Sequence, residues 1–396
     1  MAEAAAARVP SVITVDIVES TERLMGLREE WTDLLRHSAS DCLFLTWEWQ
    51  STWWRHLSRD RRLFVPVVRD RGRLVALAPM VVRPPGISSI QPFPALEFMG
   101  TGSVGSDYLD VIVRRGEEER ALAAVADCVA GAHRPLELEQ IRASGSGAED
   151  LGAHLGRKGW HVSAEEMNVS RFINLAGHSW TSYLATLGSA HRANFHRRLR
   201  RLEREFTLRF ETESTEEQRR AALGRLIALH QARWRERGFS TAFHTPNHLK
   251  FHEEFSRLAC EQGWLRIYTL WLDDEPVAAL YGFRYGGNFA FYQSGFDPNY
   301  AGFAVGLVTM GLAIGKVIEE GASEFDMLQG LERYKGHWAR ESRPLGRLDI
   351  FPPHLRGLLY RGTTELGRAA RKAARKVLPA ALADRIASLR GSGTKC

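Results

Sequence analysis

The predicted secondary-structure elements follow a similar order twice along the chain. Residues 11–175 contain helices, then an antiparallel run of strands, then strands alternating with helices. Residues 180–352 repeat this order, with an apolar helix over 305–321 between two strands. Period-two alternation marks the strands, and spacing of three and four residues marks the helices. This order predicts an α/β fold with mixed sheets, built as two similar domains in tandem.

We place the N-terminal domain at 11–178 and the C-terminal domain at 179–353, with a linker near Ala176–Thr181. Residues 354–396 are predicted to form a basic helical tail. From Leu355 onward the chain has ten Lys or Arg and two acids, which gives this segment a net charge of +8. Because the whole chain has a net charge of +6, the residues before Leu355 together carry −2. The basic character of the protein therefore belongs to its tail.

The tail has the pattern of a basic amphipathic helix. Five cations share one helical face, and an Ala-rich apolar side lies opposite. We predict that residues 363–390 dock on an anionic membrane surface. Nucleic acid would attract the same face, and a helix packed on the domains with its charges in water is the other alternative. The five cations are Arg368, Arg371, Lys372, Arg375 and Lys376.

Composition indicates the compartment. The chain is 44% hydrophobic and 25% charged and has no apolar run of about 18 residues. Its four cysteines are far apart and form no CxxC pair, which fits a reducing compartment. We therefore expect a cytoplasmic protein, with peripheral association on the inner membrane face through the tail.

Two motifs are weak candidates. GTGSVG at 100–105 is followed by strand-like SDYLDVIV, so no helix start is available for a pyrophosphate, and a Gly-rich turn is favoured. Asp107, Tyr108 and Asp110 beside it are candidates to face a cleft, with Asp107 and Tyr108 as the predicted substrate contacts. His244, His248 and His252 are four residues apart but lack an HExxH motif, so we predict packing or surface histidines and no metal site.

Two basic helical segments are stronger candidates. The segment 191–206 has one apolar face, and six arginines occupy its other faces. A solvated basic helix is the default interpretation, and a phosphate-rich ligand is the alternative. In HQARWRERG the side chains of His230, Arg233 and Trp234 share one helical face, so we predict that they bind substrate.

The region 288–330 combines a strand, a turn-rich loop and an apolar helix that starts near Val305–Gly306. Free N–H groups at such a helix start favour an anion. A buried strand–helix–strand crossover without a ligand would explain the same pattern.

Together these motifs resemble those of a known family. HQARW–G, AALYGF, YQSGFDP, GLVTMGLAIGKVIEEG and FDMLQG–E–YK–W occur in an order that resembles the CelD/BcsL family, which consists of GNAT-type acyltransferases with a BioF2-like acetyltransferase domain. SDYLD at 106–110 resembles the motif of its first half, so the similarity covers roughly 11–350. The architecture is similar to that of the double-GNAT FemABX proteins and the leucyl/phenylalanyl-tRNA–protein transferases.

The resemblance implies a donor site. Acetyl-CoA or another acyl-CoA would bind the second domain at the strand-to-helix junction, and no metal is implied. The usual phosphate signature Q/R-x-x-G-x-G/A corresponds here to FAVGLV, in which Phe303 and Val308 replace the polar and small residues. Double-GNAT proteins that use aminoacyl-tRNA lose the same signature, so tRNA is the alternative donor. The predicted donor-binding residues are Gly302, Phe303, Ala304, Val305 and Gly306.

The resemblance also implies catalytic roles. Asp326 would be the base or would orient the amine, and Lys335 would place a cation on a carbonyl or phosphate. Tyr334 or Tyr292 would be the acid. A structural ion pair between Asp326 and Lys335 is the alternative.

The resulting expectation is an N-acyltransferase that modifies an amino group of a sugar or another polar precursor, in exopolysaccharide or envelope biosynthesis. An aminoacyl-tRNA-dependent transferase of FemABX type is a second hypothesis. A degenerate GNAT pair that acts as a non-catalytic binding module is a third, and a cleft filled by side chains would favour it.

Overall fold

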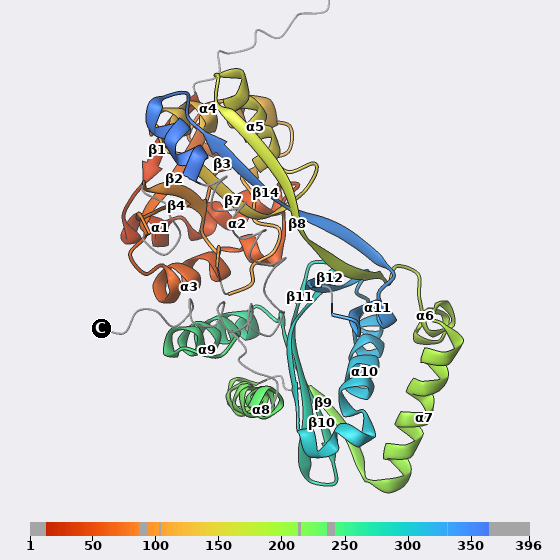
Figure 1. Cartoon of the computed structure of the whole chain (residues 1–396). Coiled ribbons are helices and arrows are strands. Elements are labelled where there is room, and N and C mark those ends of the chain that lie inside the picture. The colour runs from red at the N-terminus through yellow and green to blue at the C-terminus, as the bar shows by residue number, and fades with distance from the viewer. Residues whose placement is uncertain are drawn as a thin grey trace, which may run out of the picture.

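One mixed sheet of 14 strands runs through the molecule (Figure 1). The computed structural model describes residues 13–86, 93–102, 104–212, 215–235, 242–330 and 332–363. Apart from Thr363, the predicted tail helix over 363–390 lies outside these residues. The strand order is β6-β3-β2-β4-β5-β7-β14-β8-β13-β12-β11-β10-β9, with β1 paired to β2.

The first half of the fold comprises β1 to β8 and matches most of the predicted elements. The sequence YLDVIVR predicts a strand over 108–114, but only Ile112 and Val113 form one, β6, because Tyr108 and Asp110 bond to other parts of the molecule. The elements are β1 (Ile13–Val18), α1 (Thr21–Gly26), α2 (Arg28–Arg36), η1 (Leu43–Leu45), α3 (Trp47–Leu57), β2 (Arg62–Asp70), β3 (Arg73–Leu77), β4 (Met80–Arg83), β5 (Ala95–Phe98), β6 (Ile112–Val113), α4 (Glu118–Gly131), β7 (Leu136–Arg142), α5 (Gly147–Arg157) and β8 (His161–Asn174).

The second half comprises α6 to α11. The residue spacing over 182–206 predicts one helix, but the chain forms two, because the backbone of Leu187 and Gly188 is extended between them. The elements are α6 (Trp180–Thr186), α7 (Ser189–Glu205), β9 (Leu208–Thr212), α8 (Glu216–Arg235), α9 (Pro246–Glu261), β10 (Leu265–Leu272), β11 (Glu275–Tyr285), β12 (Asn288–Phe296), η3 (Pro298–Phe303), α10 (Val305–Glu319), β13 (Glu324–Gln329) and α11 (Lys335–Trp338).

The last strand, β14 (Glu341–Phe351), returns to the first half. It lies between β7 and β8 and is antiparallel to both. The end of β8 in turn pairs with β13 of the second half. A cut between residues 178 and 179 therefore does not separate two complete sheets, because each half depends on strands from both sides of the predicted boundary.

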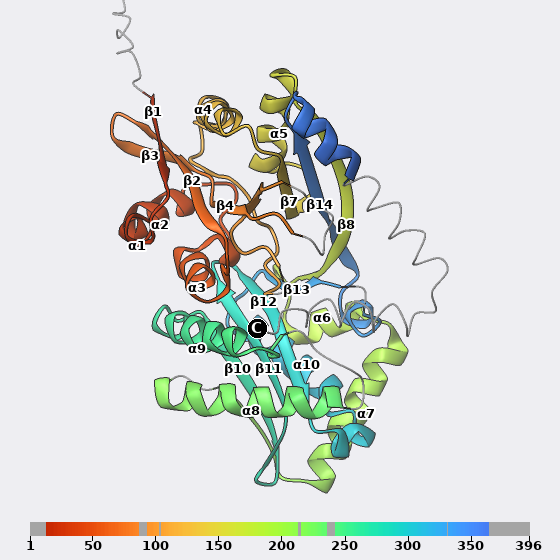
Figure 2. The ribbon, with the colours of Figure 1, turned by 60° about the vertical axis from the view of Figure 1, so that its left-hand side comes forward.

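Helices cover both faces of the second half of the sheet (Figure 1). Helices α8 and α9 pack on one face, and α10 and α7 lie on the other. Helix α3 of the first half packs on α9 (Figure 2). Trp49 makes edge contacts with Phe251 and Phe255, and the His56 Nε2 lies 2.5 Å from a Glu254 carboxylate oxygen. This packing fixes the first half against the face that carries α8 and α9.

Candidate functional site

An aperture opens between β12 and β13. These strands pair in parallel only over residues 288–290 and 324–326. Beyond this point each strand is irregular: Tyr292 is an extra residue in the pairing of β12 with β11, and β13 shifts register between Asp326 and Gln329. Leu328 has a φ of 56°, in the left-handed region. Such bulges bend a strand away from its neighbour, so the two strands diverge toward their carboxyl ends.

Two cavities adjoin at this aperture. The first, of about 370 Å³, lies on the α10 face and is lined by β11, β12, the start of α10, α11 and His191 of α7. We call it the donor cavity, because it adjoins the strand-to-helix segment where the sequence predicts the donor. The second, of about 540 Å³, is lined by β12, β13, the end of α8 and the loop containing Gly102, Val104 and Gly105, and we call it the acceptor cavity. The residues common to both are Arg233, Ser294 and Tyr334.

The donor cavity suits an anionic ligand. Its lining includes His191, Arg233 and His337, and none of the described lining residues is acidic. Ala304, with a φ of 60°, precedes α10 without a side-chain cap from the described residues, which leaves N–H groups of the first helical turn beside the cavity. Such groups favour a phosphate.

Helix α7 adds positive charge beside the start of α10. The Arg198 Nη1 donates to the Gly302 carbonyl at 2.9 Å, and the Arg201 guanidinium lies 4.4 Å from the centre of the Phe303 ring. Of the predicted donor-binding residues, Ala304, Val305 and Gly306 line the donor cavity, whereas Gly302 and Phe303 lie outside its lining and contact these arginines.

Close packing of α8 on β12 positions the basic helical face. A Cβ on Gly295 would lie 2.3 Å from the backbone nitrogen of His230, so only glycine allows this approach. Arg233 and Trp234 consequently reach the cavities, and the Arg233 Nη1 donates to the Ser294 hydroxyl at 3.3 Å. His230 lines neither cavity. Burial, followed by the Arg233 charge, lowers its pKa to about 4, so this ring is neutral at pH 7.

Three predicted catalytic side chains line the acceptor cavity: Tyr292, Tyr334 and Lys335. The Tyr292 hydroxyl is engaged as a donor to the Val104 carbonyl of the first half. The Lys335 Nζ donates to the Gln329 carbonyl at 2.6 Å and lies 3.2 Å from a Glu332 carboxylate oxygen.

Tyr334 occupies the junction between the two cavities. Its hydroxyl makes no hydrogen bond to the described residues, and burial raises the pKa of its phenol well above the usual value. This tyrosine therefore remains protonated throughout the physiological pH range and can donate a hydrogen bond where the two cavities meet.

The Asp326 carboxylate points toward the first half of the fold and does not line either cavity. Its carboxylate accepts hydrogen bonds from the Tyr108 hydroxyl at 2.6 Å, the Ser170 hydroxyl at 2.7 Å and the Leu328 N–H at 2.8 Å. It makes no ion pair with Lys335 in the described structure. This geometry favours a role of Asp326 in joining the two halves of the fold, rather than a catalytic role or an ion pair with Lys335.

SDYLD connects the two halves through Asp107 and Tyr108, whereas its Asp110 bonds within the first half. Asp107 accepts the Gln329 N–H at 2.8 Å, Tyr108 donates to Asp326, and Asp110 accepts the N–H groups of Gly147 and Ala148 at the start of α5. Tyr108 adopts a φ of 60°, which aims its ring across the interface. Tyr108 lines neither the donor nor the acceptor cavity.

Asp107 has an unusual environment. It is 0% exposed, and its Oδ1 has no hydrogen-bond partner among the described residues. Burial is the main cause that raises its pKa to about 7; the Asp326 charge adds to this, while the Gln329 N–H and the Lys335 charge oppose it. Because Gln329 and Lys335 line the acceptor cavity, this carboxylate lies directly behind the cavity wall.

The same segment closes the corresponding aperture of the first half. Strands β5 and β7 pair in parallel only at Leu96 and Leu136. Further along, the Leu109 N–H donates to the Gln140 carbonyl of β7 at 3.0 Å, and the Leu109 side chain is buried. This segment thus fills the space between β5 and β7, whereas the corresponding space between β12 and β13 in the second half remains open.

The contributions of Ser294, Gln329 and Glu332 were missed by sequence analysis. They lie inside the motifs YQSGFDP and FDMLQG–E–YK–W, but the strand bulges beside Ser294 and Gln329 leave no clear pattern that would assign these residues to the aperture. Within the described residues, no group of three or more His, Cys, Asp or Glu is placed to hold a metal ion. Among the described helices, none combines the length and hydropathy needed to span a bilayer.

Comparison with known proteins agrees with this geometry. Residues 189–336 match the profile of the acetyltransferase (GNAT) domain. No curated protein matches the sequence. The fold is similar to that of FemX, with a TM-score of 0.59 and 12% identity over 84% of this chain and 97% of that one.

Two further solved structures share the fold. One is the C-terminal domain (DUF2156) of a protein from Agrobacterium fabrum assigned as a lysylphosphatidylglycerol synthetase, with a TM-score of 0.52 and 12% identity over 84% of this chain and 92% of that one. The other is L-PGS from Bacillus licheniformis, with a TM-score of 0.50 and 15% identity over 86% and 95%. The match to a GNAT acetyltransferase domain thus covers residues 189–336, and the three solved structures share the fold of the chain.

The bridge between Tyr108 and Asp326 gives a prediction about stability. We expect Tyr108→Phe to lower the free energy of unfolding by about 1.5 to 3 kcal/mol, because it removes a buried hydrogen bond to a carboxylate. Urea unfolding of purified protein measures this change. Tyr285→Phe is the control, because Tyr285 donates to the exposed Asp41, where water can replace it. Equal losses in both variants would contradict a special role for the interface.

Proposed function

We propose that the protein is an N-acyltransferase that transfers an acyl group from acyl-CoA to an amino group of a sugar or another polar precursor. The observation that carries this proposal is the meeting of two cavities at Arg233, Ser294 and Tyr334. A donor in one cavity and an acceptor in the other would bring their reacting atoms together at this junction.

The residues at the junction support direct transfer. The acceptor nitrogen attacks the thioester carbon, the carbon–sulfur bond breaks, and the amine loses a proton while the thiolate gains one. Asp107, with its free Oδ1 and raised pKa, is the group best suited to receive the amine proton, with Lys335 of the cavity wall as the relay that takes this proton from the amine and passes one of its own to the carboxylate. Tyr334, which lines both cavities where they meet, is the group placed to protonate the sulfur.

The acceptor cavity favours a polar amine. Trp234 supplies an aromatic face, Glu332 an exposed carboxylate and Gln329 an amide, all beside the loop containing Gly102 and Gly105. An ammonium group is attracted by both a carboxylate and an indole face. This combination fits an amino sugar or a related precursor, and the order of the motifs supports placement in the CelD/BcsL family and in exopolysaccharide or envelope biosynthesis.

The donor site gives a direct test. We expect Gly306→Asp to weaken acetyl-CoA binding at least tenfold, because a carboxylate at the start of α10 would repel the donor phosphates. The fold should tolerate the change, since a Cβ at this position would only touch Phe296 at 3.5 Å. Gly306→Ala is the matched control and should bind normally. Calorimetric affinities that are equal for both variants would rule out donor phosphates at this helix start.

An aminoacyl-tRNA donor is the second candidate. The arginines of α7 beside Gly302 and Phe303, together with the replaced phosphate signature, favour it. Mass spectrometry of the purified protein for bound acyl-CoA, RNA or acceptor distinguishes the donors. Calorimetry with acetyl-CoA and with total tRNA at two salt concentrations provides a second measurement, because a longer contact with a polyanion is more salt-dependent.

A non-catalytic binding module is the third candidate. Side chains would then be expected to fill the aperture between β12 and β13. Cavities of about 370 and 540 Å³ remain open there among the described residues, which favours an enzyme. Absence of turnover with every amine acceptor, despite tight acyl-CoA binding, would favour the module instead.

A further inference from the structure

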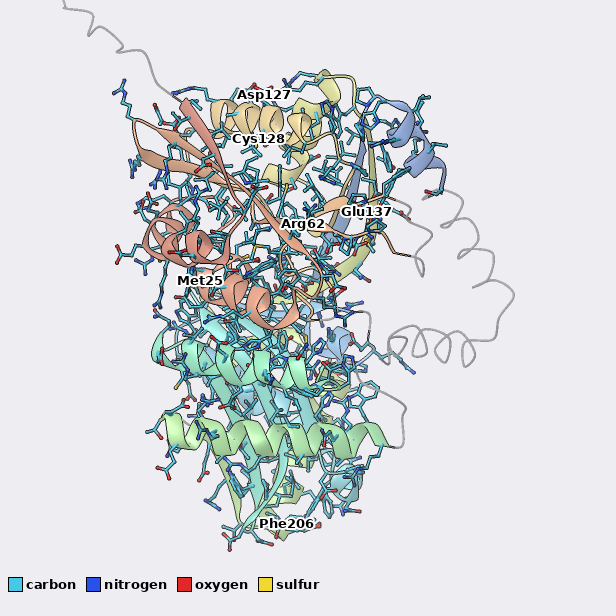
Figure 3. The ribbon with its side chains drawn as sticks, turned by 90° about the vertical axis from the view of Figure 1, so that its left-hand side faces the viewer. Met25, Arg62, Asp127, Cys128, Glu137 and Phe206 are labelled. Atoms are coloured by element: carbon cyan, nitrogen blue, oxygen red, sulfur yellow. The ribbon has the colours of Figure 1, made fainter. Side chains whose placement is uncertain are left out.

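The helix over 355–363, which follows β14, is fixed to the first half by one buried side chain. The Tyr360 hydroxyl donates to the Glu137 carboxylate at 2.6 Å and accepts from the Arg83 Nη2 at 2.9 Å. Its ring also contacts Phe351 of β14. Figure 2 shows this blue helix beside β14, and Figure 3 labels Glu137 near it. The orientation of the helix is therefore set by the protein core.

The opposite face of this helix is apolar and exposed. Leu355, Leu358 and Leu359 are 79%, 60% and 61% exposed. Their spacing of three and four residues places them on one face, and rotation of about 100° per residue turns that face away from Tyr360. Adjacent exposed leucines on a soluble domain indicate an interaction surface. We call these three residues the leucine ridge.

Positive charge surrounds the leucine ridge. The same helical rotation puts Arg356 on one flank of the ridge and Arg361 on the other. After residue 363 the sequence contains eight Lys or Arg and two acids, which adds +6. A second copy of this chain, or the basic segment 364–396 itself, would bring like charges together at the ridge. Nucleic acid would match the charge and leave the leucines without an apolar partner.

We propose that the leucine ridge docks on an anionic lipid surface, with the leucines among the headgroups and the flanking cations on lipid phosphates. This is the pattern of an interfacial helix: an apolar face bordered by Lys or Arg. Cations near such a surface add electrostatic attraction, which falls off within the Debye length of about 8 Å at physiological salt. Docking at the ridge does not depend on the identity of the acyl donor.

Co-sedimentation of the full chain with vesicles tests the proposal. At physiological salt we expect at least tenfold stronger binding to phosphatidylglycerol-rich vesicles than to phosphatidylcholine vesicles. The triple variant L355S/L358S/L359S should lose binding at least tenfold while keeping its melting temperature. Leu249→Ser is the matched control, because Leu249 is an exposed leucine of α9 at 37% exposure, and it should bind like the parent.

Three outcomes would overturn the proposal. The first is equal binding of the parent to both kinds of vesicle, or no binding. The second is undiminished binding of the triple variant, which would assign any attraction to the charges of 364–396 alone. The third is a melting temperature several degrees lower in the triple variant without lipid, or a change in its sedimentation mass, because the leucines would then be packed against this chain or a second copy.

Discussion

Replacing Asp107 by asparagine is expected to lower kcat/KM by about 100-fold or more, because the variant cannot take the proton of the acceptor amine. The proposed base has a pKa of about 7, so kcat/KM of the parent should rise with pH through this value as the carboxylate loses its proton. The variant should lack this rise. Release of free thiol from acetyl-CoA, followed at saturating donor and low acceptor concentrations across pH 5 to 9, measures both effects.

Asp110→Asn is the matched control for this variant. Asp110 belongs to the same motif, is buried, and has a pKa that burial raises to about 6. It caps α5 and lines neither the donor nor the acceptor cavity. Turnover per folded molecule should therefore be preserved in Asp110→Asn. Comparable losses in both variants, or an unchanged pH profile in Asp107→Asn, would refute a proton-accepting role for Asp107.

The charge of Asp107 should have opposite effects on stability and activity: ionisation of its carboxyl should raise activity and lower the free energy of unfolding. The folded protein holds the Asp107 proton up to about pH 7, whereas the unfolded chain releases it near pH 4. Burial of this carboxyl therefore reduces stability progressively as pH rises from about 4 to about 7, and the reduction is constant above that window. At pH 8 the asparagine variant should melt no lower than the parent. A lower melting temperature would indicate a structural role.

Replacing Tyr334 by phenylalanine is expected to lower kcat by about 100-fold, because the thiolate would leave without a proton donor. The change removes one oxygen atom from the junction of the two cavities, so donor affinity and the melting temperature should be nearly unchanged. Single-turnover rates with saturating donor and acceptor measure the chemical step separately from binding.

Tyr292→Phe provides the comparison. Its hydroxyl donates to the Val104 carbonyl, so its loss should lower the melting temperature and have the smaller effect on kcat. If Tyr292→Phe loses more turnover per folded molecule than Tyr334→Phe, the acid was assigned to the wrong tyrosine. Equal donor affinity in both variants would show that the changes act on chemistry.

Local patterns predicted most elements and the repeated order, because amphipathic helices such as α3 and α4, the apolar helix α10 and the hairpins of β10 to β12 are recognisable from their residue patterns. The role of Asp326 was less predictable. A regular strand would alternate its side chains without interruption, but β13 shifts register after this residue, and Met327 rather than Asp326 lines the acceptor cavity. A single bulge of this kind changes which face a residue occupies.

The importance of Asp107 was also only partly predictable. SDYLD was singled out as a candidate, but its acceptor bond comes from Gln329, 222 residues later in the chain. Its raised pKa results from burial between the two halves, and no local pattern encodes that burial. The CelD/BcsL resemblance, the acceptor and the membrane contact of 363–390 remain predictions, whereas a GNAT domain over 189–336 agrees with the expected class.

The position of β14 has a consequence for how the protein is made. Strands β7 and β8 both pair with β14, so each keeps an open edge until residue 351 has left the ribosome. At translation rates of about 5 to 20 residues per second, that wait lasts about 10 to 35 s after β8 has emerged. Open strand edges readily join other chains. The nascent protein therefore has a long interval in which a chaperone would be useful, and a fragment that ends before β14 would aggregate instead of folding.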